Sequence, residues 1–317
     1  METILNFLPL TGEERAAFAA AAPGVEQIFR PVAATRFSPE APEEEYARAT
    51  VILGCAPTDR VAKAGQLRWL QTWSAGVDPY LKEGVLREGA MLTSAVGAYG
   101  QAVSEHMFAT LLALCKRLHQ YRDTQNRHCW APLGEVKTLA GATVLVAGTG
   151  DIGSAFARLV KGMGAHTVGL RRSPERGAEG IDEMHPLSAL DEWLPKADVV
   201  ALVLPHSPET DRLMDRARIG RMKEDAILLN AGRGSAVDCD ALAQALEEGH
   251  LWGAGLDVTS PEPLPEDHPL WRAEHCLITP HVAGGDHLPA IRDRLVEIAL
   301  DNLRRYLAGE PLRNRMK

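Results

Sequence analysis

The sequence predicts an α/β protein with a Rossmann-type doubly wound parallel sheet and a second, smaller, flavodoxin-like α/β domain. Three observations support this prediction. Short apolar runs alternate with amphipathic stretches from about residue 140 to 284, and the first hundred residues carry a shorter alternation of the same kind. A glycine-rich turn, Gly-Thr-Gly-Asp-Ile-Gly, follows the first apolar run of the longer region. Strands that alternate with helices form parallel sheets covered by helices.

The longer region contains six candidate strands separated by helical patterns. The strands are expected at residues 143–147, 166–170, 199–204, 226–230, 253–258 and 276–279. The amphipathic stretches between them predict helices at 152–163, 188–194, 215–222 and 240–248. Gly164 and Gly249 follow two of these helices, and glycine there favours the left-handed backbone that ends a helix.

The first hundred residues repeat this pattern on a smaller scale. Strands are expected at 4–7, 49–54, 67–74 and 91–94, and helices at 13–22 and 58–64. Near the C-terminus, residues 288–308 predict one long helix, because apolar residues recur along it at helical spacing. No strand follows this helix, so we expect it to pack on the N-terminal unit.

Two domains follow from this organisation. We expect a discontinuous substrate-binding (catalytic) domain of residues 1–98 and 286–317, and a dinucleotide-binding Rossmann domain of residues 99–285.

A connecting helix is predicted at 103–118, and its apolar stripe consists of Val103, Met107, Leu111, Leu114, Cys115 and Leu118. His106 is assigned to the packing seam of this helix and not to chemistry.

Composition excludes several classes of function. Of the 317 residues, 45% are hydrophobic, which is enough for packed cores, and the net charge of −8 argues against a nucleic-acid partner. The five cysteines form no C-x-x-C pair and no cluster with zinc-ligand spacing, so we expect no metal. No signal peptide is apparent, and no apolar run approaches the roughly 18 residues of a membrane span. We therefore predict a cytoplasmic protein with no membrane partner.

The glycine-rich turn predicts a dinucleotide site. It lies between an apolar run and an amphipathic helix, so its glycines permit a tight turn and a close approach of backbone to pyrophosphate. The helix N-terminus adds NH groups and a partial positive charge. A purely structural turn is the alternative. The candidate cofactor-binding residues of the turn are Gly148, Gly150, Asp151, Ile152 and Gly153.

The end of the second strand decides between dinucleotides. NAD-binding proteins place an acid about 20 residues after the turn to bind the ribose 2′-hydroxyl. This chain has Arg171, Arg172 and Ser173 there, and two guanidinium groups with a hydroxyl suit a 2′-phosphate. We predict that NADP(H) is preferred and keep NAD(H) as the alternative, in which these arginines are a solvated loop.

Arg233, Glu262 and His281 are the candidate catalytic residues. Each lies at or just beyond the end of an apolar run, where open α/β sheets bind their ligands. A fixed cation, an acid and an imidazole are suited to hold a 2-keto carboxylate and to protonate its carbonyl. The alternatives are a structural cap for Arg233, a solvated loop carboxylate for Glu262 and a core histidine for His281.

The chain resembles the D-isomer-specific 2-hydroxyacid dehydrogenase family over nearly its whole length, and the NADP-type glyoxylate/hydroxypyruvate reductases in particular. The matching motifs are the glycine-rich turn at 148–153, Leu-Val-Leu-Pro-His-Ser-Pro-Glu-Thr at 202–210, Asn-Ala-Gly-Arg-Gly at 230–234, the segment 257–265 and Thr-Pro-His-Val-Ala-Gly at 279–284. Their order and spacing fit the family as well as their content. Gly285-Asp-His at 285–287 is a less usual continuation, which leaves the rim of the pocket open.

The resemblance implies a role for each candidate. Arg233 would bind the substrate carboxylate and keto oxygen, His281 would be the acid/base, and Glu262 would hydrogen-bond the imidazole and favour its protonated form. The substrate carboxylate would also be held by backbone NH groups of the loop Ser74, Ala75 and Gly76. The cofactor would be bordered by Pro205, Thr210, Ala231 and Asp257. The resemblance also implies a homodimer formed through the cofactor domain.

Two other functions remain open on this scaffold. The resemblance implies that a formate dehydrogenase-like enzyme would carry glutamine at the position of Glu262, and a neutral amide suits a reaction without proton transfer. The acid at Glu262 therefore favours keto-acid chemistry. A corepressor-type interaction protein would bind the dinucleotide as a conformational ligand. We predict an oxidoreductase that transfers a hydride between NADP(H) and a small 2-keto acid, with glyoxylate, hydroxypyruvate and medium-sized aliphatic keto acids all admissible.

Overall fold

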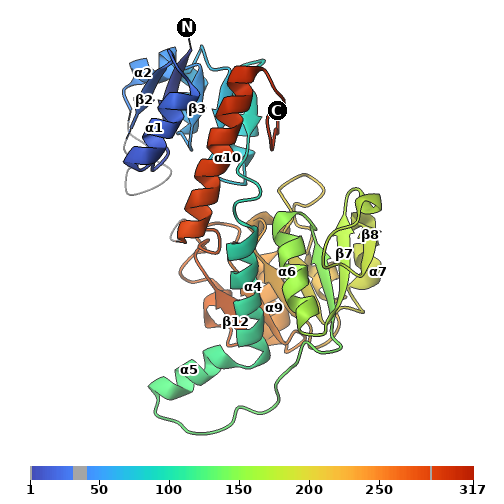
Figure 1. Ribbon diagram of the computed structural model, residues 1–317. Coiled ribbons are helices and arrows are strands. Elements are labelled where there is room, and N and C mark those ends of the chain that lie inside the picture. The colour runs from blue at the N-terminus through green and yellow to red at the C-terminus, as the bar shows by residue number, and fades with distance from the viewer. Residues whose placement is uncertain (1, 31–40, 286–287) are drawn as a thin grey trace. The chain divides into compact units, whose positions relative to one another are not determined.

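The computed structural model describes residues 2–30, 41–285 and 288–317, and the chain forms two compact units (Figure 1). Unit 1 consists of Met1–Tyr99 and Asp286–Lys317, and unit 2 of Gly100–Gly285. These boundaries differ from the predicted ones only in the side on which Tyr99 falls. Asp286 and His287, part of the predicted pocket rim, lie outside the described residues.

Unit 2 is built on a seven-stranded parallel sheet in the order β12-β11-β10-β9-β6-β7-β8. This order confirms the doubly wound Rossmann-type sheet, with its switch point between β6 and β9. The strands are β6 Thr143–Ala147, β7 His166–Arg171, β8 Glu183–Pro186, β9 Val199–Leu202, β10 Ile227–Asn230, β11 Gly253–Leu256 and β12 Cys276–Ile278. Both β9 and β10 are buried along their whole length, because helices cover both faces of the sheet.

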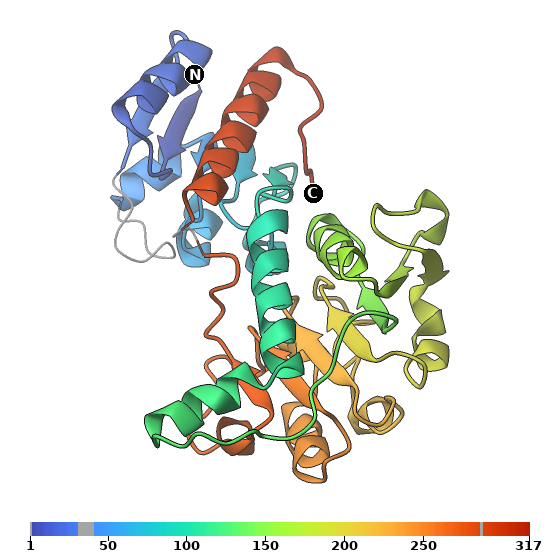
Figure 2. The ribbon, with the colours of Figure 1, turned by 60° about the horizontal axis from the view of Figure 1, so that its bottom comes forward.

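The helices of unit 2 are α4 Gly100–Cys115, α5 Leu118–Asn126, α6 Asp151–Gly162, α7 Leu190–Trp193, α8 Arg216–Ile219 and α9 Cys239–Glu247. Short 3₁₀ turns occur at η2 Pro174–Arg176, η3 Leu187–Ala189, η4 Gly234–Ala236 and η5 Pro269–Arg272. Gly164 and Gly249 follow α6 and α9 with φ of +87° and +72°, as predicted for helix ends. Figure 2 shows α4 and α6 side by side over the sheet.

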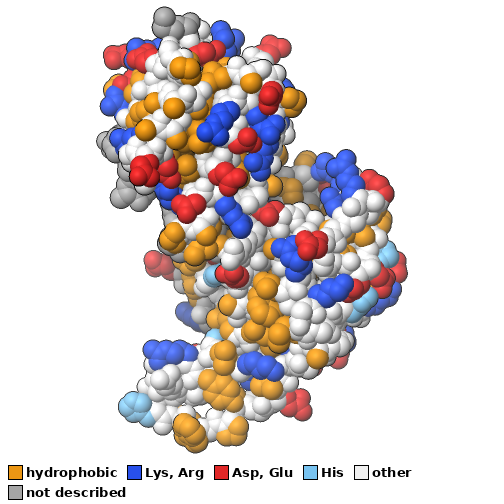
Figure 3. Space-filling view, in the orientation of Figure 1, with side chains coloured by type: hydrophobic (Ala, Val, Ile, Leu, Met, Phe, Trp, Pro, Cys, Tyr) orange, Lys and Arg blue, Asp and Glu red, His pale blue; other side chains and the backbone are white. Residues whose placement is uncertain are grey.

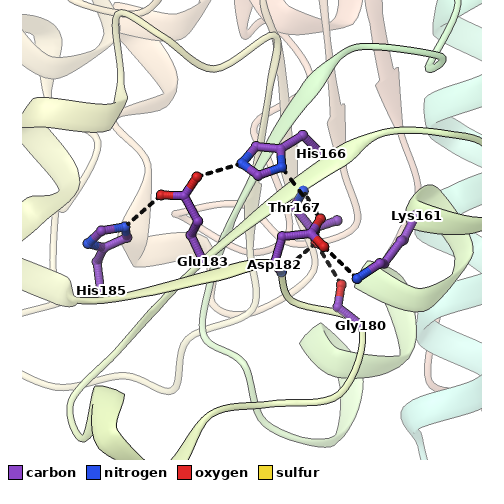
Figure 4. A network of polar contacts seen from close by, with 7 residues as sticks. All are labelled: Lys161, His166, Thr167, Gly180, Asp182, Glu183 and His185. Carbon is purple, nitrogen blue, oxygen red and sulfur yellow. Dashed lines mark hydrogen bonds and ion pairs between the residues drawn. The ribbon is translucent and has the colours of Figure 1, made fainter.

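Strand β8 is absent from the prediction because it lacks an apolar pattern. It pairs with β7 at the edge of the sheet, and polar side chains reinforce the pairing (Figure 4). Glu183 contacts His166 at 2.9 Å and His185 at 3.4 Å. Asp182 accepts bonds from Lys161 and Thr167, which hold the pKa of its carboxyl at about 2. Polar contacts of this kind leave no periodicity in the sequence.

The connecting helix ends earlier than predicted. Val103, Met107 and Leu111 are buried on α4, but Arg117 adopts a left-handed conformation with φ of +55°, so the helix stops at Cys115. Leu118, expected on the buried stripe, begins α5 and is 56% exposed. Helix α5 and the segment after it project from the rest of unit 2 as an arm (Figures 1 and 2).

Unit 1 is a second α/β unit with a five-stranded parallel sheet in the order β2-β1-β3-β4-β5. This is the flavodoxin-like order, as predicted. Its strands are β1 Thr3–Asn6, β2 Glu26–Phe29, β3 Val51–Leu53, β4 Trp69–Gln71 and β5 Met91–Thr93. Its helices are α1 Gly12–Ala21, α2 Glu43–Arg48, α3 Thr58–Lys63 and α10 Pro289–Ala308, with a 3₁₀ turn η1 Asp78–Leu81. The prediction missed β2 and α2, since two of the four residues of β2 and four of the six residues of α2 are polar.

Helix α10 belongs to unit 1 through specific contacts. Asn302 is fully buried and donates to the Gln71 side chain at 2.7 Å, and Tyr306 stacks on Trp69 with ring centroids 5.1 Å apart. The C-terminal residues add to the edge of the sheet, where Leu92 exchanges backbone bonds with Met316 and Lys317. The first and last segments of the chain therefore share one core.

We expect Glu14→Gln to destabilise unit 1 by about 1–2 kcal/mol at pH 7. Arg292 of α10 binds the Glu14 carboxylate, with one N–O distance of 2.6 Å, and lowers the pKa of Glu14 from 4.5 to about 2. A depressed pKa stabilises the fold above the unfolded pKa, so the contribution fades as pH falls from about 4.5 towards 2. Urea denaturation of both proteins at pH 7, 4 and 3 measures it. Equal stability at pH 7 would contradict the assignment.

Candidate active site

The candidate cofactor cradle lies at the carboxyl ends of β6 and β9. Gly148 has φ of +98°, and a Cβ there would lie 2.8 Å from the Val203 carbonyl oxygen. A Cβ at Gly153 would lie 1.9 Å from the Gly148 carbonyl oxygen, so helix α6 packs directly on the turn. Gly150 instead faces open space, with nothing within 4 Å of a Cβ position. The turn therefore has room for a ligand at Gly150 and no room for side chains on either side of it.

The N-terminus of α6 is suited to an anion. Gly150 is the N-cap residue of this helix. It has no side chain, so it leaves the first NH groups of the helix uncapped. Asp151 and Ile152 form the first turn of α6. The Asp151 carboxylate lies against the start of α4, where a Cβ at Gly100 would be 2.3 Å from its Oδ1. These features fit the diphosphate of a dinucleotide.

The predicted 2′-phosphate residues follow β7. Arg171 donates from Nη1 to the Gly177 carbonyl at 2.7 Å and so braces its own loop. Arg172 is exposed and Ser173 is half-buried. The Ser207 hydroxyl lowers the pKa of the Glu209 carboxyl, and the nearby positive charge of Arg172 adds to this shift. Of the two arginines, Arg172 is the more accessible to a ligand at this edge.

The loop after β9 carries Pro205 and Thr210. The Thr210 hydroxyl accepts from the Ser207 amide and donates to the Pro205 carbonyl, both at 2.8 Å. Thr210 is only 6% exposed, so its hydroxyl shapes the loop from inside. Ala231, half-buried, follows β10 and donates its amide to Leu202 at 3.1 Å.

Arg233 sits in a turn that is braced by the end of β10. The Asn230 side chain donates to the Arg233 carbonyl at 2.9 Å and accepts from the Gly232 amide at 3.1 Å. The guanidinium of Arg233 is half-buried and donates to the Gly232 carbonyl at 2.8 Å. Gly234 passes Thr259 so closely that a Cβ would be 1.7 Å from its carbonyl oxygen. These contacts therefore restrict the backbone of this turn to a single conformation.

His281 and Glu262 form a hydrogen-bonded pair. His281 Nδ1 lies 2.6 Å from Glu262 Oε1, and both side chains remain accessible, at 54% and 43% exposure. An ionised carboxylate can only accept, so the proton of this bond belongs to Nδ1. The other ring nitrogen, Nε2, takes no part in this bond. The pairing that was expected from the resemblance is present.

Backbone bonds link the candidate residues across three neighbouring strand ends. The Asp257 amide donates to the Asn230 carbonyl at 3.0 Å, and the His281 amide donates to the Asp257 carbonyl at 2.8 Å. Since Asn230 also holds Arg233, the ends of β10, β11 and β12 position Arg233, Asp257 and His281 together. Glu262 joins them from the segment that follows Asp257.

The loop Ser74, Ala75 and Gly76 lies in unit 1, beyond the carboxyl end of β4. The Ser74 hydroxyl donates to the Gly76 carbonyl at 2.5 Å, and the Ser74 carbonyl accepts from Thr72 and Ala95. The loop is therefore preorganised, and all three residues are partly exposed.

Comparison with known proteins identifies the group to which these motifs belong. The model of the D-isomer specific 2-hydroxyacid dehydrogenase NAD binding domain matches residues 108–283. The chain belongs to the D-isomer-specific 2-hydroxyacid dehydrogenase family. The match covers most of unit 2, so the glycine-rich turn and the strand-end loops described above lie in a nucleotide-binding domain of this family.

Individual relatives of the family extend the likeness over both units. The glyoxylate reductase/hydroxypyruvate reductase of Mus musculus is 32% identical over 276 residues, which are 83% of this chain and 83% of that protein. The structure of a D-isomer specific 2-hydroxyacid dehydrogenase family protein from Aeromonas salmonicida is 33% identical, covers 100% of this chain and 99% of its own, and has a TM-score of 0.84. An NADPH-dependent glyoxylate/hydroxypyruvate reductase from Sinorhizobium meliloti, in complex with NADP and sulfate, is 26% identical, covers 100% and 98%, and has a TM-score of 0.80.

This dehydrogenase is therefore a pyridine-nucleotide-dependent hydroxyacid oxidoreductase. No group of three or more potential metal ligands occurs in the part of the chain that the structure describes. Among those same residues, every helix is too short or too polar to cross a membrane. Sequence reasoning assigned His106 to the packing seam of its helix and gave Thr279 no role of its own, but the two side chains meet at 3.1 Å.

Proposed function

We propose that this dehydrogenase reduces a small 2-keto acid to the D-2-hydroxy acid with NADPH. The 2.6 Å bond between His281 and Glu262, next to the braced Arg233 turn, is the observation that carries the proposal. The pair and the turn together supply a proton donor, a carboxylate that orients it and a fixed cation for an anionic substrate.

Each residue contributes one step. Arg233 binds the substrate carboxylate and the keto oxygen through its guanidinium, which stays charged at any working pH. When bound, NADPH supplies the hydride that the keto carbon accepts. The electron pair of the carbonyl bond then moves to oxygen, and His281 transfers its Nε2 proton to that oxygen. Glu262 holds Nδ1–H throughout, so the imidazole keeps its orientation and Nε2 remains the nitrogen that faces the keto oxygen.

The hydrogen-bonded pair of His281 and Glu262 supports a 2-keto acid as the substrate class in this proposal. Glu262 is ionisable, whereas a formate dehydrogenase-like reaction needs no acid partner for the histidine. Glyoxylate and hydroxypyruvate are the first substrates to test, because the relatives from Mus musculus and Sinorhizobium meliloti are named as reductases of these two compounds. The backbone of Ser74, Ala75 and Gly76 provides a second grip on the carboxylate in this proposal.

A panel of 2-keto acids with NADPH and NADH, and of formate with NADP and NAD, tests the function directly. We expect turnover of glyoxylate or hydroxypyruvate and none of formate. Formate oxidation without keto-acid reduction would favour the formate dehydrogenase-like alternative. Tight dinucleotide binding without any turnover would favour the corepressor-type alternative.

The preference for NADPH rests on Arg171, Arg172 and Ser173. We expect Arg172→Ala to lower the NADPH/NADH ratio of kcat/KM by about 10- to 100-fold, with kcat for NADH unchanged, since one charge-assisted bond to a 2′-phosphate is lost. Steady-state kinetics with both nucleotides measures the ratio. Arg158→Ala, an exposed arginine on α6 that pairs with Glu179, is the matched control and should leave the ratio unchanged. A wild-type preference for NADH would remove NADP from the proposal.

A homodimer formed through unit 2 is part of the same proposal. The arm formed by α5 and residues 127–137 exposes Trp130 completely, and Leu118 and Val136 are each more than half exposed. Figure 3 shows hydrophobic side chains gathered along this arm. Such a surface is costly for a monomer. Sedimentation equilibrium of the full chain should give twice the monomer mass of 34.4 kDa.

A further inference from the structure

Three polar side chains from distant parts of the chain form one hydrogen-bonded row behind the candidate active site. His106 projects from α4, Thr279 follows β12, and Asp257 follows β11. His106 Nε2 lies 3.1 Å from Thr279 Oγ1, and Thr279 Oγ1 lies 2.6 Å from Asp257 Oδ1. None of the roles assigned above uses His106 or Thr279.

The direction of each bond follows from proton counting. The Asp257 carboxylate can only accept, so the single hydroxyl proton of Thr279 points to Asp257. The Thr279 oxygen must then accept from His106, which places a proton on His106 Nε2. The row therefore runs from His106 through Thr279 to Asp257, and removing the donor at His106 or the hydroxyl at Thr279 interrupts it.

Asp257 in turn fixes the loop that carries His281. Its Oδ1 accepts the Val282 amide at 2.9 Å, and its Oδ2 accepts the Ala283 amide at 3.0 Å. Its backbone carbonyl accepts the His281 amide at 2.8 Å. Asp257 is only 6% exposed, so these bonds are shielded from water. The carboxylate thus binds the residues that immediately follow His281, while Thr279 binds it from the other side of the turn.

His281 needs this restraint because of its backbone. Its φ is +52°, a left-handed conformation that a residue with a side chain rarely adopts. Such a conformation persists where the surrounding structure over-determines it, and it is typical of functional sites. His106, Thr110, Asn230, Asp257 and Thr279 line one small pocket behind this turn. The bonds of Asp257 to residues 281, 282 and 283 make the row of side chains a support for the turn.

We propose that His106 and Thr279 are positioning residues that hold Asp257, and through it the left-handed turn, so that His281 stays aligned with Glu262. This inference rests on the proposed role of His281 and adds the residues that act through it. A displaced imidazole transfers its proton poorly although substrate still binds, so the defect falls on kcat more than on KM.

The experiment compares variants that remove one bond with variants that keep it. Thr279→Val has no hydroxyl and His106→Leu has no donor, and we expect each to lower kcat about 10- to 100-fold with KM for the keto acid changed less than threefold. Thr279→Ser and His106→Gln retain the hydroxyl and a donor, and should recover most of the activity. Thr110→Val lines the same cavity without joining the row, and should match the wild type.

A double-mutant cycle separates positioning from general damage. In the His281→Asn background, Thr279→Val should have almost no further effect on kcat, because its effect acts through His281. Additive losses would overturn the proposal. So would wild-type kcat in both Thr279→Val and His106→Leu.

A readout without turnover keeps this inference distinct from the proposed function. Proton–nitrogen NMR of selectively labelled histidine detects the Nδ1–H of His281 bound to Glu262. We expect this signal in the wild type and its loss or broadening in Thr279→Val, with folding checked by circular dichroism. If no keto acid is turned over but the signal is lost in the variant, the positioning row stands and the proposed function fails. An unchanged signal in the variant contradicts the row.

Discussion

Replacing His281 with asparagine lowers kcat by about 10²- to 10⁴-fold, while the Kd for NADPH stays within about twofold of the wild type. Asparagine keeps a polar group of similar size next to Glu262 but cannot deliver a proton to the growing alkoxide. The candidate cofactor cradle lies at the carboxyl ends of β6 and β9 and is untouched by the change. Steady-state kinetics on the best keto acid and a fluorescence titration of NADPH measure the two quantities.

The control for this variant is His185→Asn. His185 lies on the edge strand β8 beside Glu183, in the polar network of Figure 4, and has no place in the proposed chemistry. It should retain wild-type kcat. Turnover of His281→Asn within tenfold of the wild type would remove this histidine from the mechanism and leave proton delivery unassigned.

Replacing Arg233 with glutamine lowers kcat/KM for the keto acid by about 10²- to 10⁴-fold. Glutamine can still hydrogen-bond, but it carries no charge and no planar fork for a carboxylate. The half-buried position of Arg233 makes its charge count for more than that of a surface cation. We expect both a higher KM and a lower kcat, since the guanidinium contacts the keto oxygen as well as the carboxylate in the proposed mechanism.

Two control measurements accompany this prediction. Arg216→Gln, which removes an exposed cation on α8, should leave kcat/KM unchanged and excludes a general effect of net charge. Inhibition by a simple dicarboxylate or 2-hydroxy acid should weaken in Arg233→Gln in parallel with substrate binding. If KM and inhibitor affinity both match the wild type, Arg233 does not hold the anion.

The element types in unit 2 were predictable because burial leaves a pattern. Strands such as β9 and β10 are covered on both faces, so their residues are apolar without interruption, and the six predicted strands are all present. The strands that were missed, β2 and β8, lie at sheet edges. Both are held by backbone bonds and polar contacts, which leave no hydrophobic periodicity, whereas the edge strands β5 and β12 carry apolar runs and were predicted.

The candidate site divides in the same way. Its chemistry was readable from residue type and motif spacing: the glycine turn, Arg233, Glu262 and His281 all stand at strand ends, and the pairing of His281 with Glu262 was expected. The supporting contacts were not readable. Asp257 was expected at the cofactor, yet its carboxylate also accepts the backbone amides of residues 282 and 283. Leu118 was expected in the core, although α4 ends before it.

Residue order alone was enough to predict the fold class, the family and a set of residues suited to catalysis, because hydrophobic periods and local motifs act over a few neighbouring positions. How those residues are held depends on the packing of elements that lie far apart in the chain. His106 and Thr279 are 173 positions apart and meet because β11, β12 and α4 pack together. A hydrogen bond between side chains so far apart depends on the packing of three elements, and no local pattern in the chain encodes it.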